Sequence, residues 1–383
     1  MERRPNMVEP QLAELQTWLT EPLTSAVAES VSRLRAAEGV KKVCLMPDVH
    51  LAAEVCVGAV VATEGALYPQ AVGGDIGCGM AALRFDLEAE ALSNERPAGA
   101  VLAALYRSVP SNKHRQAVPL PEALRPADLS EQTLAKLATR DGAVQLGTLG
   151  RGNHFLEFQV DEAGQLWVML HSGSRAMGQA ITALHVSNGE PNRFGLRGLD
   201  AETHLGAAYL KDVAWARKYA TENRLAMLRA VEELMSRLFR ADADWKSLIH
   251  ADHNHVQREA YGGRSYFVHR KGAQSAADGE SGVVPGSMGA ASFHTVGRGC
   301  AASLSSCSHG AGRRMSRTEA RQEITSKSFQ RQVGGLWYDH RRVDRLRDES
   351  PGAYKNIREV MRAQRELVKI VRKLRPLLSY KGV

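Results

Sequence analysis

The sequence predicts a single large domain of the α+β class, in which mixed β-sheets are surrounded by helices. The chain has 383 residues and is 44% hydrophobic, which is enough to build a sizeable core. Helical and strand-like segments are interleaved without a steady βα period, and no repeat of about 20–50 residues is found. These observations exclude a solenoid and a (β/α)₈ barrel, and they favour one domain spanning residues 1–383.

Three segments carry apolar residues at helical spacing, at roughly 11–37, 203–240 and 352–374. In the last segment one apolar stripe is formed by Ile357, Val360, Met361, Leu367, Val368, Val371 and Leu374. Short apolar runs bounded by turn residues predict buried strands at Val40–Leu45, Val55–Ala62, Leu166–Leu170 and Tyr266–Val268. We expect all of these segments to pack the core rather than to carry chemistry.

Two stretches are predicted to be irregular. Residues 108–128 form an excursion within the domain, because they contain Pro110, Pro119, Pro121 and Pro126. Residues 276–282 contain Asp278 followed by Gly279, a pair typical of a turn.

The composition predicts a cytoplasmic protein with no membrane partner. No run of about 18 apolar residues occurs, and the segment Met1–Pro5 leads into no apolar signal-peptide core. The five cysteines are an odd number and include no C-x-x-C pair. This argues against a disulfide framework and against a structural zinc knuckle.

Positive charge is concentrated at the C-terminal end. The net charge is +8, whereas residues 311–383 alone hold 19 Lys and Arg against 8 Asp and Glu. This asymmetry suits a phosphate-rich partner such as a nucleic acid. Charge alone leaves the alternative of a solvated basic helix equally open.

The residues suited to metal binding lie in short blocks at the ends of apolar runs. Asp75 and Cys78 stand three apart among glycines, so one tight loop can point a carboxylate and a thiolate at one ion. His154 and His171 each stand beside small residues at the end of a predicted strand, and His253 lies in a cluster of imidazoles at 250–255. Together they offer the mixed donor set of a transition metal such as Mn, Fe, Co or Zn.

Taken one at a time, each block also has a structural interpretation. A buried cysteine beside a turn aspartate, or a hydrogen-bonded loop histidine, needs no metal. The five candidates are spread over about 180 positions, so spacing alone leaves their convergence open.

A phosphate cradle is predicted at 284–289, the segment Val284-Pro285-Gly286-Ser287-Met288-Gly289, whose glycines and serine offer backbone N–H groups and a hydroxyl. It is not a P-loop, because the sequence contains no G-x-x-x-x-G-K-[ST] motif.

The segment 308–317 contains a candidate nucleophile, His309, flanked by small residues that let a substrate approach the imidazole. Ser316 followed by Glu319 predicts a capping box, and Arg313 and Arg317 are spaced to share one helical face. Two guanidinium groups beside an accessible imidazole suit phosphoryl or nucleotidyl transfer.

In identity and order these blocks resemble the RtcB family of RNA-splicing and repair ligases. The matching segments are Pro47–His50, Asp75–Gly79, 147–157, His171–Arg175, His253–Asn254, His269–Ala273, Pro285–Gly289, His309–Arg317, Pro351–Lys355 and Lys381–Gly382. They run from about residue 45 to the end of the chain, and several are long and uncommon.

The resemblance implies an RtcB-like fold and a GTP- and Mn²⁺-dependent RNA ligase active in RNA repair or tRNA splicing. Its substrates would be RNA ends carrying a 2′,3′-cyclic phosphate or 3′-phosphate and RNA ends carrying a 5′-hydroxyl. His309 would form a histidine–GMP intermediate, and Asp48 would orient its imidazole. Two manganese ions would be held by Asp75, Cys78, His154, His171 and His253, with Cys78 as a possible bridge.

The resemblance also implies residues that bind the two substrates. GTP would be bound by Asn153, Glu157, Asn254, Pro285, Gly286, Ser287, Met288, His309, Gly310, Ala311, Gly312, Tyr354 and Lys381. RNA phosphates would be held by Arg175, Arg313 and Arg317.

Several points stay open at this level. The chain has 51–54 as Leu-Ala-Ala-Glu where the family has a Gly-rich turn, and Gly74 where a larger residue is common, which puts the preferred RNA end in doubt. The alternatives are a paralogue that chiefly caps 3′-phosphates with GMP or repairs one specific RNA, a metal-bearing RNA-binding protein without turnover, and a plain metallohydrolase. The oligomeric state and the need for an activating partner such as archease are not predicted.

Overall fold

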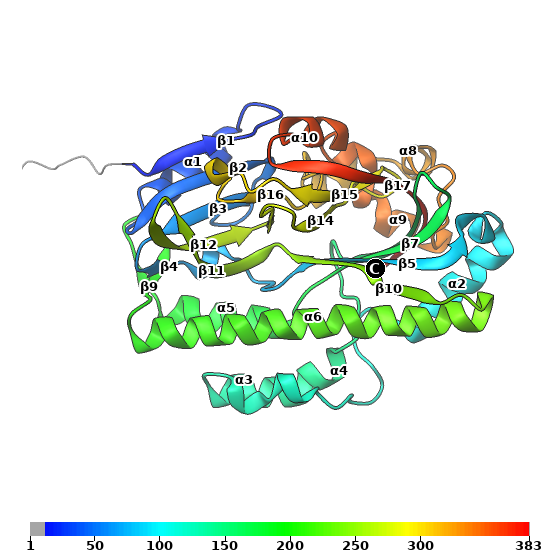
Figure 1. Cartoon of the computed structure of the whole chain (residues 1–383), viewed down its shortest axis with the longest axis horizontal. Coiled ribbons are helices and arrows are strands. Elements are labelled where there is room, and N and C mark those ends of the chain that lie inside the picture. Colours follow the sequence, from blue (N-terminus) through cyan, green and yellow to red (C-terminus); the bar gives the residue numbers. More distant parts are fainter. Residues whose placement is uncertain (1–11, 383) are drawn as a thin grey trace, which may run out of the picture.

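The computed structural model describes residues 12–382, which form a mixture of helices and sheets in one large body (Figure 1). This confirms the predicted α+β class. Two large sheets dominate. The five-stranded sheet has the order β1 (Glu14–Thr17), β2 (Val40–His50), β3 (Val57–Thr63), β12 (Arg264–Lys271), β11 (Asn254–Tyr261).

The seven-stranded sheet positions most of the candidate site. Its order is β10 (Ala243–Asp252), β5 (Gly79–Glu88), β7 (Gln165–Ser172), β6 (Phe155–Val160), β17 (Val368–Lys381), β15 (Ser292–Gly297), β14 (Ser281–Val284). Two small sheets complete the set, one of β13 (Ala273–Ser275) and β16 (Ser306–Ser308), the other of β4 (Ala66–Leu67), β9 (Arg197–Asp200) and β8 (Glu190–Pro191).

The long helix α6 (His204–Phe239) runs beneath the sheets in Figure 1, with α5 (Ala176–Asn188) beside it. Thr203 caps its first turn by accepting from the backbone N–H of Gly206. Its buried stripe and α2 (Glu95–Ser108) cover the apolar face of β5, β6 and β7. The remaining helices are α1 (Ser25–Arg35), α3 (Gln132–Leu137), α4 (Ala143–Gln145), α7 (Arg317–Glu323), α8 (Ser326–Gln332), α9 (Val343–Leu346) and α10 (Ile357–Ala363).

The hairpin of β6 and β7 has a clear local cause. The Asp161 carboxylate accepts hydrogen bonds from the backbone N–H groups of Ala163 and Gln165, and Gly164 adopts φ +82°. This turn fixes the register in which Phe155 lies opposite His171.

The four predicted strands are confirmed as parts of β2, β3, β7 and β12, and the helix over 203–240 is confirmed as α6. Residues 276–282 contain the predicted turn at Asp278 and Gly279. Residues 109–128 contain no strand and only two short 3₁₀ turns, Glu122–Leu124 and Pro126–Asp128. None of the helices in residues 12–382 is long and apolar enough to cross a membrane.

Two helix predictions were wrong in extent. Within 11–37 only α1 is helical, because Glu14–Thr17 pairs in parallel with residues 42–45 of β2. Within 352–374 the helix α10 ends at Ala363, and the chain enters β17 at Val368, which pairs with β15. In both places long-range strand pairing overrides a local helical pattern.

Candidate active site

The sheet topology gathers the predicted metal ligands at one edge. Cys78 immediately precedes β5, His154 immediately precedes β6, and His171 lies near the end of β7. Because β7 pairs antiparallel with both β5 and β6, the three residues meet. The strand β10, on the other side of β5, brings His253, and Asp75 lies in the loop before Cys78.

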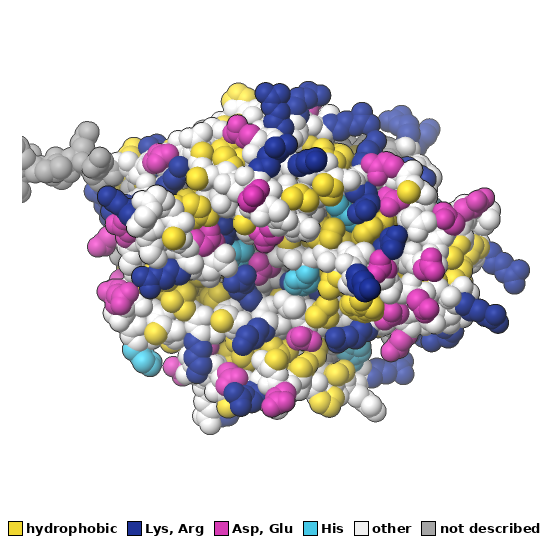
Figure 2. Space-filling model, viewed as in Figure 1, with side chains coloured by type: hydrophobic (Ala, Val, Ile, Leu, Met, Phe, Trp, Pro, Cys, Tyr) yellow, Lys and Arg dark blue, Asp and Glu magenta, His cyan; other side chains and the backbone are white. Residues whose placement is uncertain are grey.

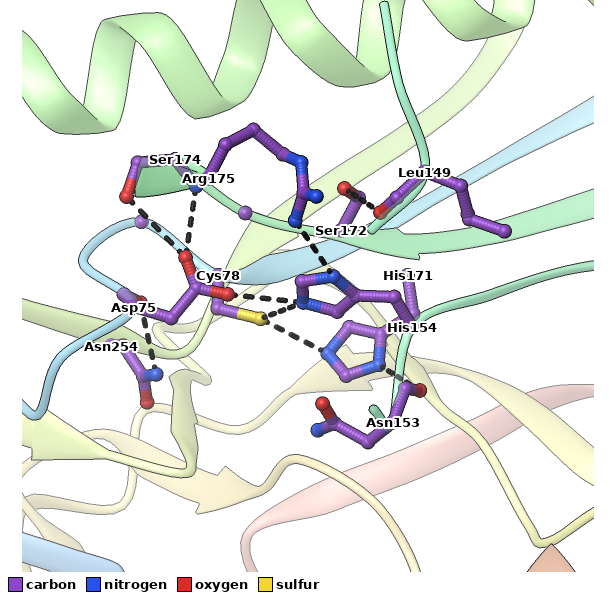
Figure 3. A network of polar contacts seen from close by, with 12 residues as sticks. Asp75, Cys78, Leu149, Asn153, His154, His171, Ser172, Ser174, Arg175 and Asn254 are labelled. Carbon is purple, nitrogen blue, oxygen red and sulfur yellow. Dashed lines mark hydrogen bonds and ion pairs between the residues drawn. The ribbon is translucent and has the colours of Figure 1, made fainter. Parts of the chain in front are cut away.

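The ligand atoms lie in two groups that share one sulfur (Figure 3). Cys78 Sγ is 3.5 Å from Nε2 of His154 and 3.2 Å from Nε2 of His171. Nε2 of His154 is 3.0 Å from Oδ2 of Asp75, and Nε2 of His171 is 3.3 Å from Nε2 of His253. The groups Asp75–Cys78–His154 and Cys78–His171–His253 each have their ligand atoms within 4.8 Å of one another.

The chemistry of these groups fits a pair of divalent cations. Burial lowers the pKa of His171 and of His253 well below the usual value, so both imidazoles are neutral. Nδ1 of His171 faces the backbone carbonyl of Asn153 at 3.1 Å, which leaves the Nε2 lone pair directed at the cluster. Burial raises the pKa of the Cys78 thiol well above its usual value, and a bound cation would stabilise the thiolate instead.

Asp75 is held in place by its surroundings. Burial opposes its ionisation, but the hydrogen bond and charge of His154 outweigh it and bring the pKa of Asp75 to about 2. The backbone N–H of Ser174 donates to Oδ1 of Asp75 at 3.0 Å. A Cβ at Gly173 would overlap the Asp75 carboxylate, so this position requires glycine.

Arg175 contacts the cluster directly. It precedes α5 with φ +57°, an uncommon conformation for a residue other than glycine. Its guanidinium lies 3.4 Å from Nδ1 of His154 and donates to the Thr148 hydroxyl at 3.3 Å. Its role in holding RNA phosphates stays a prediction.

A buried asparagine and arginine on α6 hold the loops that carry the ligands. Arg224, which is fully buried, donates to the carbonyl oxygens of Gly77 at 2.7 Å and of Ser172 at 2.6 Å. These carbonyls flank Cys78 and His171. The neighbouring Asn223 satisfies further backbone groups of the loops at 147–148 and 173.

His309 lies against the metal-ligand cluster and is oriented by Asp48. Nδ1 of His309 is 2.6 Å from Oδ2 of Asp48, and the backbone N–H of His309 donates to the same oxygen at 3.1 Å. Asp48 is fully buried, and His309 is 16% exposed. Because the carboxylate accepts from Nδ1, the Nε2 lone pair of His309 is free. The rings of His309 and His253 are 4.8 Å apart.

A cavity of about 240 Å³ opens on His309, with room for a small organic ligand rather than a single water. It lies between the seven-stranded sheet and the loops at 285–288 and 309–313. Its lining includes all but one of the residues predicted to bind GTP: Asn153, Glu157, Pro285, Gly286, Ser287, Met288, His309, Gly310, Ala311, Gly312, Tyr354 and Lys381.

Asn254 is the exception, because it does not line this cavity. Its side-chain N–H donates to the carbonyl oxygen of Asp75 at 3.0 Å, and its Oδ1 accepts from the backbone N–H of Gly272 at 2.8 Å. Its amide is therefore engaged in holding the loop that carries Asp75.

The Glu349 carboxylate, in the cavity wall, contacts several of the candidate residues. Glu349 accepts from the Lys381 ammonium, from the Tyr354 hydroxyl at 3.0 Å and from Arg317 at 2.7 Å. Burial opposes ionisation of Glu349, but Lys381 and the arginines lower its pKa below the usual value. Burial also raises the pKa of Glu157, across the cavity, to about 7.

The prediction that Arg313 and Arg317 share a helical face was wrong. The capping box of Ser316 and Glu319 is present, but α7 begins only at Arg317. Arg313 instead forms a β-bridge to Tyr354, and its guanidinium donates to the tyrosine hydroxyl at 2.9 Å. The two arginines still converge, because both lie near Glu349, at 3.7 Å for Arg313.

A second groove meets the cavity at His50, Arg313 and Arg317, which line both. Its volume is about 580 Å³, and its walls include the exposed Arg314 and the Lys355 ammonium. The groove therefore gives a basic route from the surface to the neighbourhood of His309.

These features define a class of site. The buried cluster consists of a thiol, imidazoles and a carboxylate. Together with a histidine oriented by a carboxylate and an adjoining polar cavity, it suits metal-assisted phosphoryl or nucleotidyl transfer. The comparisons with known proteins agree. The chain matches the family model described as tRNA-splicing ligase RtcB over residues 28–127 and 123–382. The chain therefore belongs to the RtcB family.

Curated relatives cover almost the whole chain. It is 37% identical over 373 residues to RNA-splicing ligase RtcB of Escherichia coli strain K12, a match covering 89% of this chain and 90% of that protein. It is 38% identical over 371 residues, with the same coverage, to RNA-splicing ligase RtcB1 of Escherichia coli strain ATCC 25922. RNA-splicing ligase RtcB of Mycobacterium tuberculosis is 29% identical over 416 residues, covering 88% of this chain and 96% of that protein.

The sequence interpretation missed residues that support the site. Arg224 and Asn223 occupy core-facing positions of an otherwise apolar helical stripe, and that unusual placement was a usable signal. Glu349 gave a weaker signal, since it is one acid in an arginine-rich segment.

Proposed function

We propose that this chain is a GTP- and Mn²⁺-dependent RNA ligase that joins a 2′,3′-cyclic phosphate or 3′-phosphate end to a 5′-hydroxyl end. The single observation that carries the proposal is the pairing of His309 with the buried Asp48, because His309 lines the cavity and lies beside His253 of the ligand cluster. Family membership supports the ligase class, and the relatives are named RNA-splicing ligases.

His309 serves as the nucleophile. Nε2 forms a bond to the α-phosphorus of GTP while the bond to pyrophosphate breaks, which leaves a histidine–GMP intermediate. Asp48 holds the Nδ1 proton, so the imidazole presents its lone pair and its developing positive charge is stabilised. The GMP group then passes to the RNA 3′-phosphate, and the 5′-hydroxyl displaces GMP.

Asp75, Cys78, His154, His171 and His253 would hold two manganese ions. Bound there, the ions neutralise negative charge on the reacting phosphates. The support is the donor set itself, with its two groups sharing the Cys78 sulfur.

The cavity beside His309 is the proposed binding site for GTP. An ionised Glu157 accepts hydrogen bonds from the N–H groups of guanine, and Lys381 and Tyr354 supply donors on the neighbouring wall. Ser287 and Met288 line the same cavity, where their backbone N–H groups would face the phosphate oxygens. Before GTP binds, the contact with Glu349 holds the Lys381 ammonium in place. Bound GTP would compete with Glu349 for this ammonium.

The groove is the proposed binding site for the RNA ends. Arg313 and Arg317 lie where groove and cavity meet, which suits them to phosphates at the ends being joined. Arg175 lies beside His154 of the ligand cluster, where it would contact a phosphate near the metal ions.

The test is covalent labelling. With Mn²⁺ and α-labelled GTP the protein should acquire a label through an acid-labile, alkali-stable phosphoramidate bond. An absence of label with Mn²⁺, and with Co²⁺ or Zn²⁺ in its place, would contradict the proposal. Cytoplasmic location stays a prediction.

A further inference from the structure

Only some of the Lys and Arg residues of the C-terminal fifth belong to the candidate active site. Residues 358–375 contain seven Lys and Arg against two Glu, a net charge of +5, and none of them lines the nucleotide cavity. This segment comprises most of α10, the following turn and the first half of β17.

The helix exposes its cations and buries its apolar side chains. Ile357, Val360 and Met361 pack into the core. Arg358 and Arg362, four residues apart, lie on the exposed face, and Arg365 is exposed in the turn that follows. Arg362 and Arg365 line one shallow hollow of the surface.

The first half of β17 is an edge strand on one side. Residues 368–374 pair only with β15, because β6 joins β17 only from Arg375 onward. Lys369 and Lys373 are exposed along this edge. Between them Ile370 is 44% and Val371 is 50% exposed, at a bulge in the pairing with β15.

Arg298 extends the same surface. Its backbone N–H donates to the carbonyl oxygen of Leu367 at 3.0 Å, which places it beside the start of β17. We define the α10–β17 basic surface by six exposed residues: Arg298, Arg358, Arg362, Arg365, Lys369 and Lys373.

Within residues 12–382, none of these six side chains makes an ion pair or a side-chain hydrogen bond. The nearby acids are engaged elsewhere, since Glu366 accepts from the Trp18 indole and Glu359 from the Asn356 amide. Figure 2 shows Lys and Arg side chains gathered at the top of the view, where Figure 1 places α10 and the start of β17. Exposed and unpartnered cations favour a polyanionic partner.

The surface is also connected to the active site. The strand that carries Lys369 ends in Lys381, which lines the nucleotide cavity. Twelve residues of extended strand span at most about 40 Å. The two regions are separated by most of the length of β17, so one RNA strand whose end lies at His309 can extend along β17 to Lys369.

We propose that the α10–β17 basic surface binds the sugar–phosphate backbone of the RNA substrate, away from the ends that are joined; this inference rests on the proposed function. Guanidinium and ammonium groups neutralise phosphates without reading sequence. Ile370 and Val371 offer apolar contact to riboses or unstacked bases. The surface supplies affinity and orientation, and the groove at Arg313 supplies recognition of the end.

A structural role for these cations makes a different prediction. Charged residues on an exposed edge strand prevent pairing with another chain. If that were their whole role, removing the charge would cause association of the protein and leave RNA affinity unchanged.

The test uses a fluorescent single-stranded RNA with a 3′-hydroxyl and a 5′-phosphate, ends that the proposed reaction cannot join. The full chain carrying Arg362→Glu, Arg365→Glu and Lys369→Glu is compared with a matched variant, Lys211→Glu, Arg229→Glu and Arg237→Glu. The matched cations are exposed on α6, on the opposite side of the molecule (Figure 1).

We expect the surface variant to bind RNA at least tenfold more weakly at about 50 mM salt, with a salt slope smaller by about 2 for three lost contacts. The matched variant should bind within about twofold of the parent. Labelling by α-labelled GTP should be unchanged in both. A milder set, with Gln in place of Glu, should give an intermediate loss if folding is intact by circular dichroism.

Several outcomes would overturn the proposal. Equal losses in the two variants would mean that only net charge matters. Unchanged RNA affinity in the surface variant would also overturn the proposal. If that variant self-associated, the cations would serve to prevent edge pairing; if it instead lost binding to phosphatidylserine vesicles, the surface would bind membranes. If the parent joins no RNA ends but the surface variant still loses affinity, the proposed ligation fails and the RNA surface stands.

Discussion

The buried active centre and the α10–β17 basic surface differ in whether their cationic side chains have partners. In the centre each cation has a partner: Arg317 contacts Asp348 and Glu349, and Arg321 also reaches Asp348. On the surface the cations have no partner among residues 12–382. Cations of both kinds occur in the arginine-rich C-terminal fifth, so composition alone could not separate them.

This difference predicts two kinds of response. Partnered, buried charges act over short distances and define geometry, so changes there should impair chemistry at every salt concentration. Exposed charges act at longer range, so changes there should be graded and salt-dependent.

The largest effect is expected for His309→Ala. Without the imidazole no bond to the α-phosphorus can form, so the label from GTP should fall below detection at low and at high salt. His340→Ala, which changes an exposed histidine, serves as the control. An acid-labile label that persists in His309→Ala would move the nucleophile to another residue.

Cys78→Ala should remove most of the bound manganese, because the Cys78 sulfur belongs to both ligand groups. We expect a loss of at least about 100-fold in affinity, measured by metal analysis after dialysis against known free Mn²⁺. Cys56→Ala, at an equally buried cysteine outside the cluster, should keep its manganese. An unchanged metal content in Cys78→Ala would remove this residue from the ligand set.

Arg224→Met tests a positioning residue on α6. Loss of its hydrogen bonds to Gly77 and Ser172 should loosen the loops that carry Cys78 and His171, and weaken Mn²⁺ binding by about 10- to 100-fold. Activity should recover at saturating Mn²⁺, which a general folding defect would not allow. Arg229→Met, on the exposed face of the same helix, should be neutral; equal losses in both would refute the positioning role.

The smallest effect concerns pH. Burial raises the pKa of Glu157 to about 7, and only the ionised form accepts from guanine. The ionised fraction rises with pH, so KM for GTP in the labelling reaction should fall as pH rises toward 8. Below pH 7, KM should increase by up to about tenfold per pH unit. Glu157→Gln should flatten this profile; an identical profile in the variant would assign the titration to another group.

The sequence predicted most of the candidate site because the chemistry-bearing residues are local and distinctive. His309, Cys78 and Asp75 stand in glycine-rich blocks whose identity and order resemble a known family. The strands rich in β-branched residues and the capped helix α6 could also be predicted, because burial of one face sets the spacing of their apolar residues.

What the sequence could not predict depends on distant partners. The predicted helical stripe continues to Leu374, but pairing with β15 makes residues 368–374 a strand. Glu349 reaches the cavity wall only because the fold brings it to Lys381. Arg313 lies outside the helix that Ser316 begins, which no local spacing indicates.

The most direct test of the account is ligation of defined RNA ends with GTP and Mn²⁺. Donors ending in a 3′-phosphate, a 2′,3′-cyclic phosphate or a 3′-hydroxyl are each offered to a 5′-hydroxyl acceptor. The account predicts that the first two are joined and the third is not. Joining of the 3′-hydroxyl donor, or accumulation of GMP-capped 3′ ends without any joined product, would contradict it.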